Sequence, residues 1–199
     1  DPRVGVAGGS YGGAIALLAA GYDARIDAIA PRITWHDLAQ SLFPQFASDG
    51  EPTTPAAFAP IGDPGVFKRL WAGVFFGSGS ASETEPAVCG RFGDDVCDAY
   101  SASAATGTPT PEILRLLESS SPASVLDRID APALILQGQA DSLFPLSEGD
   151  ANARGIAAGG TPVKLVWFAG GHDGGDQEED RLDALTLAWF DRYLRDDGT

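Results

Sequence analysis

Four short and largely apolar runs, each bordered by glycine or proline, predict the strands of a sheet. They are Arg3–Ala7, Ile26–Ala30, Ala133–Gln137 and Val163–Phe168. Runs of this length and composition are too short for helices that fold on their own and are typical of buried strands. We therefore expect these four segments to lie side by side in one sheet.

Between these runs, apolar residues recur in patterns that favour helices. We expect helices at Tyr11–Ala20, Ser147–Ala158 and Glu178–Leu194, with Gly21 ending the first and Gly159–Gly160 ending the second. In the last helix, steps of three and four residues give one apolar face, formed by Leu182, Leu185, Trp189 and Tyr193. Strands that alternate with helices predict an α/β fold with a parallel sheet and helices on its faces.

The segment 33–121 interrupts this alternation and is rich in proline, glycine, serine and aromatic residues. One helix is expected on a stripe formed by Val66, Phe67, Leu70, Trp71, Val74 and Phe75. A second begins at Thr110–Pro111, with threonine as the cap and proline in the first turn. Gly77–Ser82 predicts a flexible link between them. We expect residues 1–32 and 122–199 to form the core and residues 33–121 a helical cap.

The charge of the chain limits the partners to consider. The formal net charge is −15 over 199 residues. Such an acidic surface repels phosphate backbones, which argues against nucleic acid as a partner. No apolar run approaches the roughly 18 residues that a membrane span requires. Because the chain begins at Asp1 and contains no methionine, we expect it to be a processed or truncated part of a longer protein.

Two cysteines, Cys89 and Cys97, allow two interpretations. They could close a disulfide in a small loop, which would indicate an oxidising compartment, or remain as buried free thiols. The chain has neither a CxxC pair nor a Cys/His cluster, so no metal site and no cofactor is implied. Localisation stays open, and a secreted or extracytoplasmic bacterial protein is suggested only by the cysteine pair and the acidic composition.

The first candidate for catalysis lies where the first predicted strand meets the first predicted helix. Gly8–Gly12 reads G-x-S-x-G, the pattern of a nucleophile elbow, in which a sharp turn exposes the serine hydroxyl. Glycines are needed beside the serine because a Cβ would collide with a neighbouring element. A phosphate-binding turn is the alternative, but the G-x-G-x-x-G spacing and a P-loop lysine are lacking. We therefore predict Ser10 as a nucleophile.

A serine nucleophile needs a base, and the chain has two histidines. His172 lies between glycines directly after the last predicted strand, which indicates a loop at the edge of the sheet. His36 lies at the start of the predicted cap and is interpreted as an ordinary surface or core side chain. We predict His172 as the base.

The base in turn needs a carboxylate that holds its ring. Asp141 follows the third predicted strand by a few residues, at the edge where open α/β sheets place their sites. Asp37, which follows the second strand, is the rival. The chain order of Ser10, Asp141 and His172 is the order of α/β-hydrolases and differs from those of chymotrypsin and subtilisin.

An oxyanion hole requires two donors, and the backbone N–H of Tyr11 supplies one. The second normally comes from a loop before the elbow, and only nine residues precede Ser10. Losing one donor costs about 10²–10³ in turnover. Without upstream strands, Arg3–Ala7 would also form an exposed apolar edge. We therefore expect residues 1–199 alone to be poorly stable or inactive and the missing upstream part of the same fold to be their partner.

Three segments resemble the X-prolyl dipeptidyl-peptidase family of hydrolases, which includes cocaine-esterase-like and cephalosporin acylase enzymes. They are Gly-x-Ser-Tyr-x-Gly at residues 8–13, LQGQADSLFP at 136–145 and WFAGGHDGG at 167–175. The resemblance implies an α/β-hydrolase core with an inserted helical cap and hydrolysis of esters or amides through an acyl-enzyme. It also implies an upstream tyrosine as second oxyanion donor and, in many members, a β-sandwich, and neither has a counterpart here.

The sequence therefore predicts a serine hydrolase that acts on a small ester, an amide or a short peptide. Trp35 and Phe144 are predicted to line the acyl pocket, whereas Trp71 and Phe75 are interpreted mainly as packing residues. A peptidase that holds a free amine would need a carboxylate, and the candidates in the cap are Glu83, Glu85, Asp94 and Asp95. The alternative is a catalytically silent, hydrolase-like binding domain of a larger protein.

Overall fold

The computed structural model describes residues 2–44, 67–80, 89–90 and 92–195. Within them, a parallel sheet of four strands runs in the order of the sequence. The strands are β1 (Val4–Gly9), β2 (Ile26–Arg32), β3 (Ala133–Gly138) and β4 (Val163–Phe168). This arrangement confirms the predicted α/β class, and each strand matches one of the four predicted runs to within a few residues.

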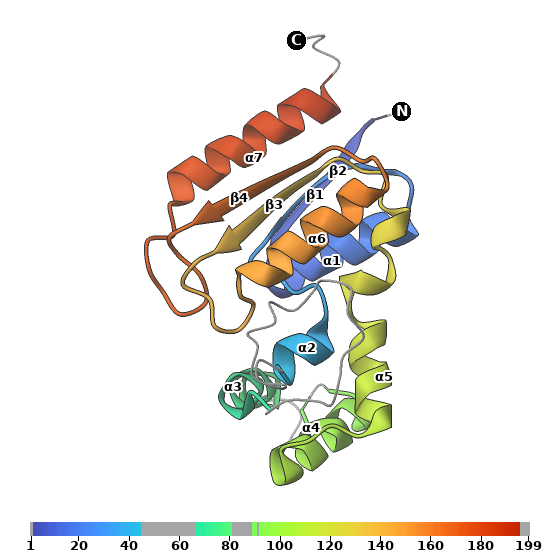
Figure 1. Cartoon of the computed structure of the whole chain (residues 1–199), viewed down its shortest axis with the longest axis vertical. Coiled ribbons are helices and arrows are strands. Elements are labelled where there is room, and N and C mark those ends of the chain that lie inside the picture. Colours follow the sequence, from blue (N-terminus) through green and yellow to red (C-terminus); the bar gives the residue numbers. More distant parts are fainter. Residues whose placement is uncertain (1, 45–66, 81–88, 91, 196–199) are drawn as a thin grey trace, which may run out of the picture.

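Helices cover both faces of the sheet (Figure 1). On one face lie α1 (Tyr11–Tyr22) and α6 (Leu146–Ala158), and on the other lies α7 (Glu179–Leu194). The first core cluster joins α1 and α6 to the sheet through Leu17, Ile29, Ile135, Ala153 and Ile156. The second joins α7 to the opposite face through Ala30, Leu134, Leu136, Val166, Phe168 and Leu182. Successive strand residues therefore alternate between two apolar cores, which explains why the strands read as continuous apolar runs.

Strand β1 lies at one edge of the sheet, as expected from the sequence. Most of its residues are exposed, and Val4 retains 45% of its accessible surface. The prediction that Gly21 ends α1 is wrong, because the helix continues to Tyr22 and Asp23 forms its C-cap. A Cβ at Gly21 would lie 2.6 Å from the Cβ of Val125, so this glycine permits close packing.

The segment between β2 and β3 is helical wherever the structure describes it, apart from short connections. Figure 1 shows its helices grouped beyond one end of the sheet. They are α2 (Leu38–Leu42), α3 (Arg69–Ser80), α4 (Asp94–Thr106) and α5 (Pro111–Ser119), followed by the 3₁₀ turns η1 (Pro122–Ser124) and η2 (Leu126–Arg128). The side chain of Thr110 accepts a hydrogen bond from the N–H of Ile113, which confirms the predicted cap of α5. The division into core and cap stays a prediction.

Two sequence-based expectations in this segment need correction. Gly77–Ser80 form the last turn of α3 instead of a flexible link, while positions 81 and 82, like Val66, lie outside the described residues. The Ser78 hydroxyl donates to the carbonyl of Val74, so its polar group is satisfied within the helix. Helix α4 was not predicted, and within it Cys97 forms a disulfide with Cys89. No helix in the described part of the chain is both long and apolar enough to cross a bilayer.

Candidate active site

Ser10 occupies the sharp turn between β1 and α1. Its φ of 53° lies in the left-handed region, which is unfavourable for a residue with a side chain and is typical of a nucleophile elbow. The turn is held by a hydrogen bond of 2.8 Å from the N–H of Ser10 to the carbonyl of Arg32. A Cβ at Gly8 would lie 2.5 Å from the carbonyl of Gly12. Gly8, two residues before the serine, is therefore required by space, as the sequence pattern predicted. A Cβ at Gly9 or Gly12 would meet no heavy atom of the described residues within 4 Å, so the prediction is wrong for these two glycines.

His172 lies in the loop after β4 and joins the other two predicted site residues. Its Nε2 is 2.8 Å from the hydroxyl oxygen of Ser10, and its Nδ1 is 2.7 Å from Oδ2 of Asp141. Because an ionised carboxylate can only accept, the proton between His172 and Asp141 belongs to Nδ1. Nε2 is then free of a proton and can accept the one on Ser10.

Asp141 is placed by the loop that follows β3. Its side chain is fully buried, its Oδ1 accepts a 2.7 Å hydrogen bond from the N–H of Phe144, and its Oδ2 also accepts the N–H of His172 at 3.3 Å. The loop is bonded to the loop of His172, since the N–H of Ala140 donates to Gly170 and the N–H of Asp173 donates to Ala140. These backbone bonds fix the carboxylate relative to the imidazole.

The structure brings Ser10, Asp141 and His172 together, and the rival Asp37 makes its hydrogen bonds elsewhere. Asp37 instead caps α2, where its carboxylate accepts the N–H groups of the next helical residues. His36 is buried, and its Nδ1 is 3.1 Å from the side-chain oxygen of Asn152. The interpretation of His36 as an ordinary core side chain agrees with this position.

Aromatic rings surround the imidazole of His172. Phe144 and Trp71 make edge contacts with it at centroid distances of 5.4 Å and 5.9 Å. Trp35 lies one ring further away, 5.1 Å from Phe144, and both of these predicted pocket residues are buried. Trp71 was interpreted as a packing residue of a helical stripe, and its contact with His172 was missed. Tyr11, whose N–H is the predicted oxyanion donor, directs a largely exposed ring toward Trp35.

Sequence reasoning also missed Lys68, whose ammonium group donates to the carbonyls of Ser142 and Leu143 at 2.6 Å and 2.9 Å. The N–H and the hydroxyl of Ser142 donate in turn to the carboxylate of Asp173. The same hydroxyl accepts the indole N–H of Trp71 at 3.2 Å. The available signal was the position of Lys68 three residues before Trp71, directly before the helix that carries Trp71.

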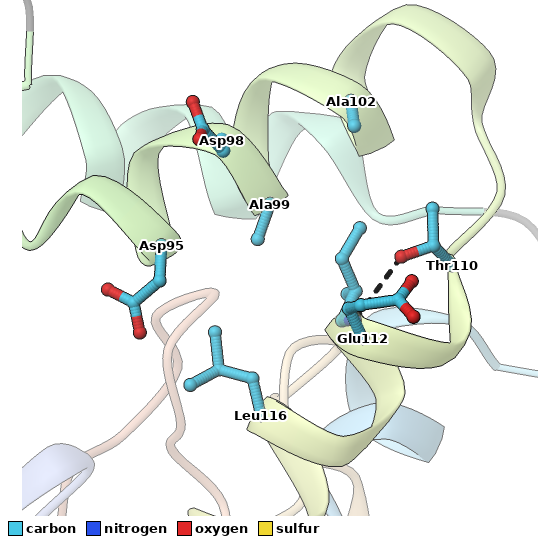
Figure 2. Close-up of a pocket in the computed structure, with 8 residues that line it drawn as sticks. Asp95, Asp98, Ala99, Ala102, Thr110, Glu112 and Leu116 are labelled. Atoms are coloured by element: carbon cyan, nitrogen blue, oxygen red, sulfur yellow. Dashed lines mark hydrogen bonds between the residues drawn. The ribbon is translucent and has the colours of Figure 1, made fainter.

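A separate pocket of about 370 Å³ lies between α4 and α5 (Figure 2). Figure 2 shows the carboxylates of Asp95, Asp98 and Glu112 at this pocket, whose lining also includes Ile113 and Leu116. The predicted amine-binding candidate Asp95 thus belongs to a pocket that none of the three proposed catalytic residues lines. Asp94 begins α4, and the candidates Glu83 and Glu85 lie outside the described residues.

Solved structures with a similar fold include hydrolases of several kinds. Acylaminoacyl peptidase of Pyrococcus horikoshii matches with a TM-score of 0.56 and 18% identity over 98% of this chain and 24% of that one. A puromycin-hydrolysing peptidase of Mycobacterium tuberculosis matches with a TM-score of 0.58 and 21% identity over 98% of this chain and 23% of that one. An esterase of Pyrococcus furiosus matches with a TM-score of 0.54 and 12% identity over 96% of this chain and 54% of that one.

This chain has the α/β-hydrolase fold. Among curated proteins, acylamino-acid-releasing enzyme 2 of rice, Oryza sativa subsp. japonica, is 29% identical over 100 residues. That match covers 49% of this chain and 13% of the rice protein, and the chain spans about a quarter of the two peptidases above. No protein-family model matches the chain. These comparisons show the fold, whereas membership of the X-prolyl dipeptidyl-peptidase family stays a prediction.

Proposed function

We propose that this chain carries the catalytic centre of a serine hydrolase, with Ser10 as nucleophile, His172 as base and Asp141 as the orienting acid. The observation that carries the proposal is the unbroken series of hydrogen bonds from Oγ of Ser10 through both ring nitrogens of His172 to the buried carboxylate of Asp141. A serine hydroxyl becomes an effective nucleophile when such a base accepts its proton.

The reaction follows from this geometry in two halves. Oγ of Ser10 attacks the acyl carbonyl carbon while its proton moves to Nε2 of His172. The tetrahedral intermediate then breaks the bond to the leaving group, which takes that proton, and an acyl-enzyme remains. A water molecule repeats the sequence and releases the acid. The carboxylate of Asp141 stabilises the imidazolium that forms in each half.

The negative oxygen of the intermediate needs donors on the side of α1. Tyr11 is the first residue of this helix, so its N–H has no helical carbonyl four residues earlier to donate to. The positive end of the helix dipole also favours the developing charge there. We propose the Tyr11 N–H as one oxyanion donor.

The proposed substrates are esters and N-acylated amino acids or peptides. The rice relative is named as an enzyme that releases acylamino acids, and the matched structures include an acylaminoacyl peptidase and an esterase. The aromatic rings of Trp71 and Phe144 beside His172 suit an apolar group next to the scissile bond. The X-prolyl peptide expected from the sequence resemblance carries a free amine in place of an N-acyl group, so it is a separate candidate substrate.

The proposal is tested by the hydrolysis of three chromogenic substrates: p-nitrophenyl acetate, N-acetyl-alanine p-nitroanilide and Ala-Pro p-nitroanilide. The protein is used in its native form, with any sequence that precedes or follows the 199 residues. We expect hydrolysis of at least one substrate that disappears in the Ser10→Ala variant. Equal rates in the two proteins would exclude Ser10 as the nucleophile, and the preferred substrate separates esterase from peptidase.

The role of Asp141 gives a quantitative prediction. Asp141→Asn preserves the shape of the side chain but presents an amide N–H or a weaker acceptor to Nδ1 of His172, which favours the wrong tautomer. We expect kcat to fall about 10⁴-fold. Asp37→Asn is the matched control, because asparagine also caps helices well and Asp37 lies outside the hydrogen-bonded series. Similar losses in the two variants would contradict the assignment.

A further inference from the structure

Helix α3 belongs to the segment between β2 and β3, called the inserted segment below. It reaches the loop that carries Asp141. Lys68 stands directly before this helix, and its backbone is fixed at both ends. Its N–H donates to the carbonyl of Leu42 at 2.8 Å, and its own carbonyl accepts the N–H of Ala72 at 3.1 Å. The side chain of Lys68 therefore starts from an ordered backbone and can hold what it binds in a defined place.

The ammonium group of Lys68 binds the stretch of chain that holds the carboxylate of Asp141. It donates to the carbonyls of Ser142 and Leu143, the two residues that follow Asp141. The next residue, Phe144, donates its N–H to Oδ1 of Asp141 and is itself held at its carbonyl by the buried side chain of Gln137. Lys68 thus fixes the turn whose backbone orients the proposed acid.

The charge of Lys68 strengthens these bonds. The side chain is partly buried, and burial lowers its pKa, while the carboxyl groups of Glu148, Asp141 and Asp173 oppose that shift. Hydrogen bonds from an ionised donor are roughly twice as strong as neutral ones. A hydrated surface lysine would gain little from such contacts, whereas this one is partly withdrawn from water.

The first turn of α3 also contacts the proposed base. Trp71, three residues after Lys68, places its ring against the imidazole of His172 and donates its indole N–H to the hydroxyl of Ser142. One helix of the inserted segment therefore touches both the loop of Asp141 and the ring of His172. Arg69, the neighbouring cation, is exposed and has no contact of this kind among the described residues.

We propose that Lys68 is a positioning residue for the reaction proposed above, which it serves by holding the 142–144 turn so that Asp141 is oriented toward His172. The inference rests on the proposed function of Ser10, Asp141 and His172. It assigns to the inserted segment a part in assembling the catalytic residues, in addition to any contact with substrate.

Kinetics of Lys68→Met, Lys68→Arg and Arg69→Met in the native protein test this role. Methionine keeps the apolar stem of lysine but removes its donors, so we expect kcat for the best of the three substrates to fall about 10- to 100-fold with little change in KM. Arginine should restore part of the loss, because it also donates to carbonyls. Arg69→Met should match the wild type. An unchanged kcat in Lys68→Met, or an equal loss in Arg69→Met, would overturn the proposal.

Two further measurements separate positioning from a general loss of stability. In the Asp141→Asn background, Lys68→Met should cost almost nothing more, because both changes act on the same interaction. The Nδ1 proton of His172, observed by NMR and distinguished from that of His36 by a His36→Gln variant, should exchange faster with water in Lys68→Met. If the wild-type protein hydrolyses none of the substrates, the proposed function fails. The exchange rate of the Nδ1 proton then tests by itself whether Lys68 positions Asp141, and an unchanged rate in Lys68→Met would contradict that role.

Discussion

Replacing His172 with alanine is expected to lower kcat by at least about 10⁴-fold, the largest effect of any change outside Ser10. The variant leaves Oγ of Ser10 without a proton acceptor, and the leaving group without a proton donor. The measurement is the initial rate on the best of the three chromogenic substrates at saturating concentration.

The other histidine provides the control for this prediction. His36 is buried and bonded to Asn152, so His36→Gln is expected to reduce stability while the folded fraction keeps its kcat. If His172→Ala retained more than about a tenth of the wild-type rate, a base that contributes the usual 10²-fold or more would be excluded at this position.

Replacing Gly8 with alanine is expected to destabilise the protein by about 3 kcal/mol. The added Cβ would lie 2.5 Å from the carbonyl carbon and oxygen of Gly12, and backbone atoms in the first turn of α1 cannot move aside as a flexible side chain can. The strand and the helix would have to separate, which also displaces Ser10. Denaturant unfolding measures the loss, and hydrolysis should fall with it.

The neighbouring glycine is the matched control for Gly8. A Cβ at Gly9 would have no heavy atom of the described residues within 4 Å, so Gly9→Ala should change the free energy of unfolding by less than about 1 kcal/mol. If the two variants had equal stability, the tight contact between β1 and α1 would not exist, and the elbow geometry described for Ser10 would be wrong.

The parts of the fold that could be predicted are those set by local patterns. Strands β2, β3 and β4 were recognisable because their buried residues enter two apolar cores, so each reads as a largely apolar run. Ser10, Asp141 and His172 were predictable for a related reason. Ser10 directly follows β1, Asp141 and His172 lie in the loops after β3 and β4, and the carboxyl ends of parallel strands meet at one edge of the sheet.

The parts that could not be predicted depend on contacts between distant segments. Helix α4 carries many small and polar residues and lacks an apolar stripe, so its sequence gives no helical period. It is bounded by Gly93 and Gly107 and joined by a disulfide to Cys89. Lys68 was missed because its role depends on how the inserted segment folds back onto the loop of Asp141.

The proposed catalytic role of Ser10 is tested most directly by a fluorophosphonate probe, which loses fluoride and forms a covalent bond only with an activated serine oxygen. We expect one probe molecule per native protein, located by mass spectrometry on the peptide that contains Ser10. Labelling should be absent in Ser10→Ala and strongly slowed in His172→Ala. A protein that remains unlabelled at Ser10, or is labelled equally well without His172, would contradict the account.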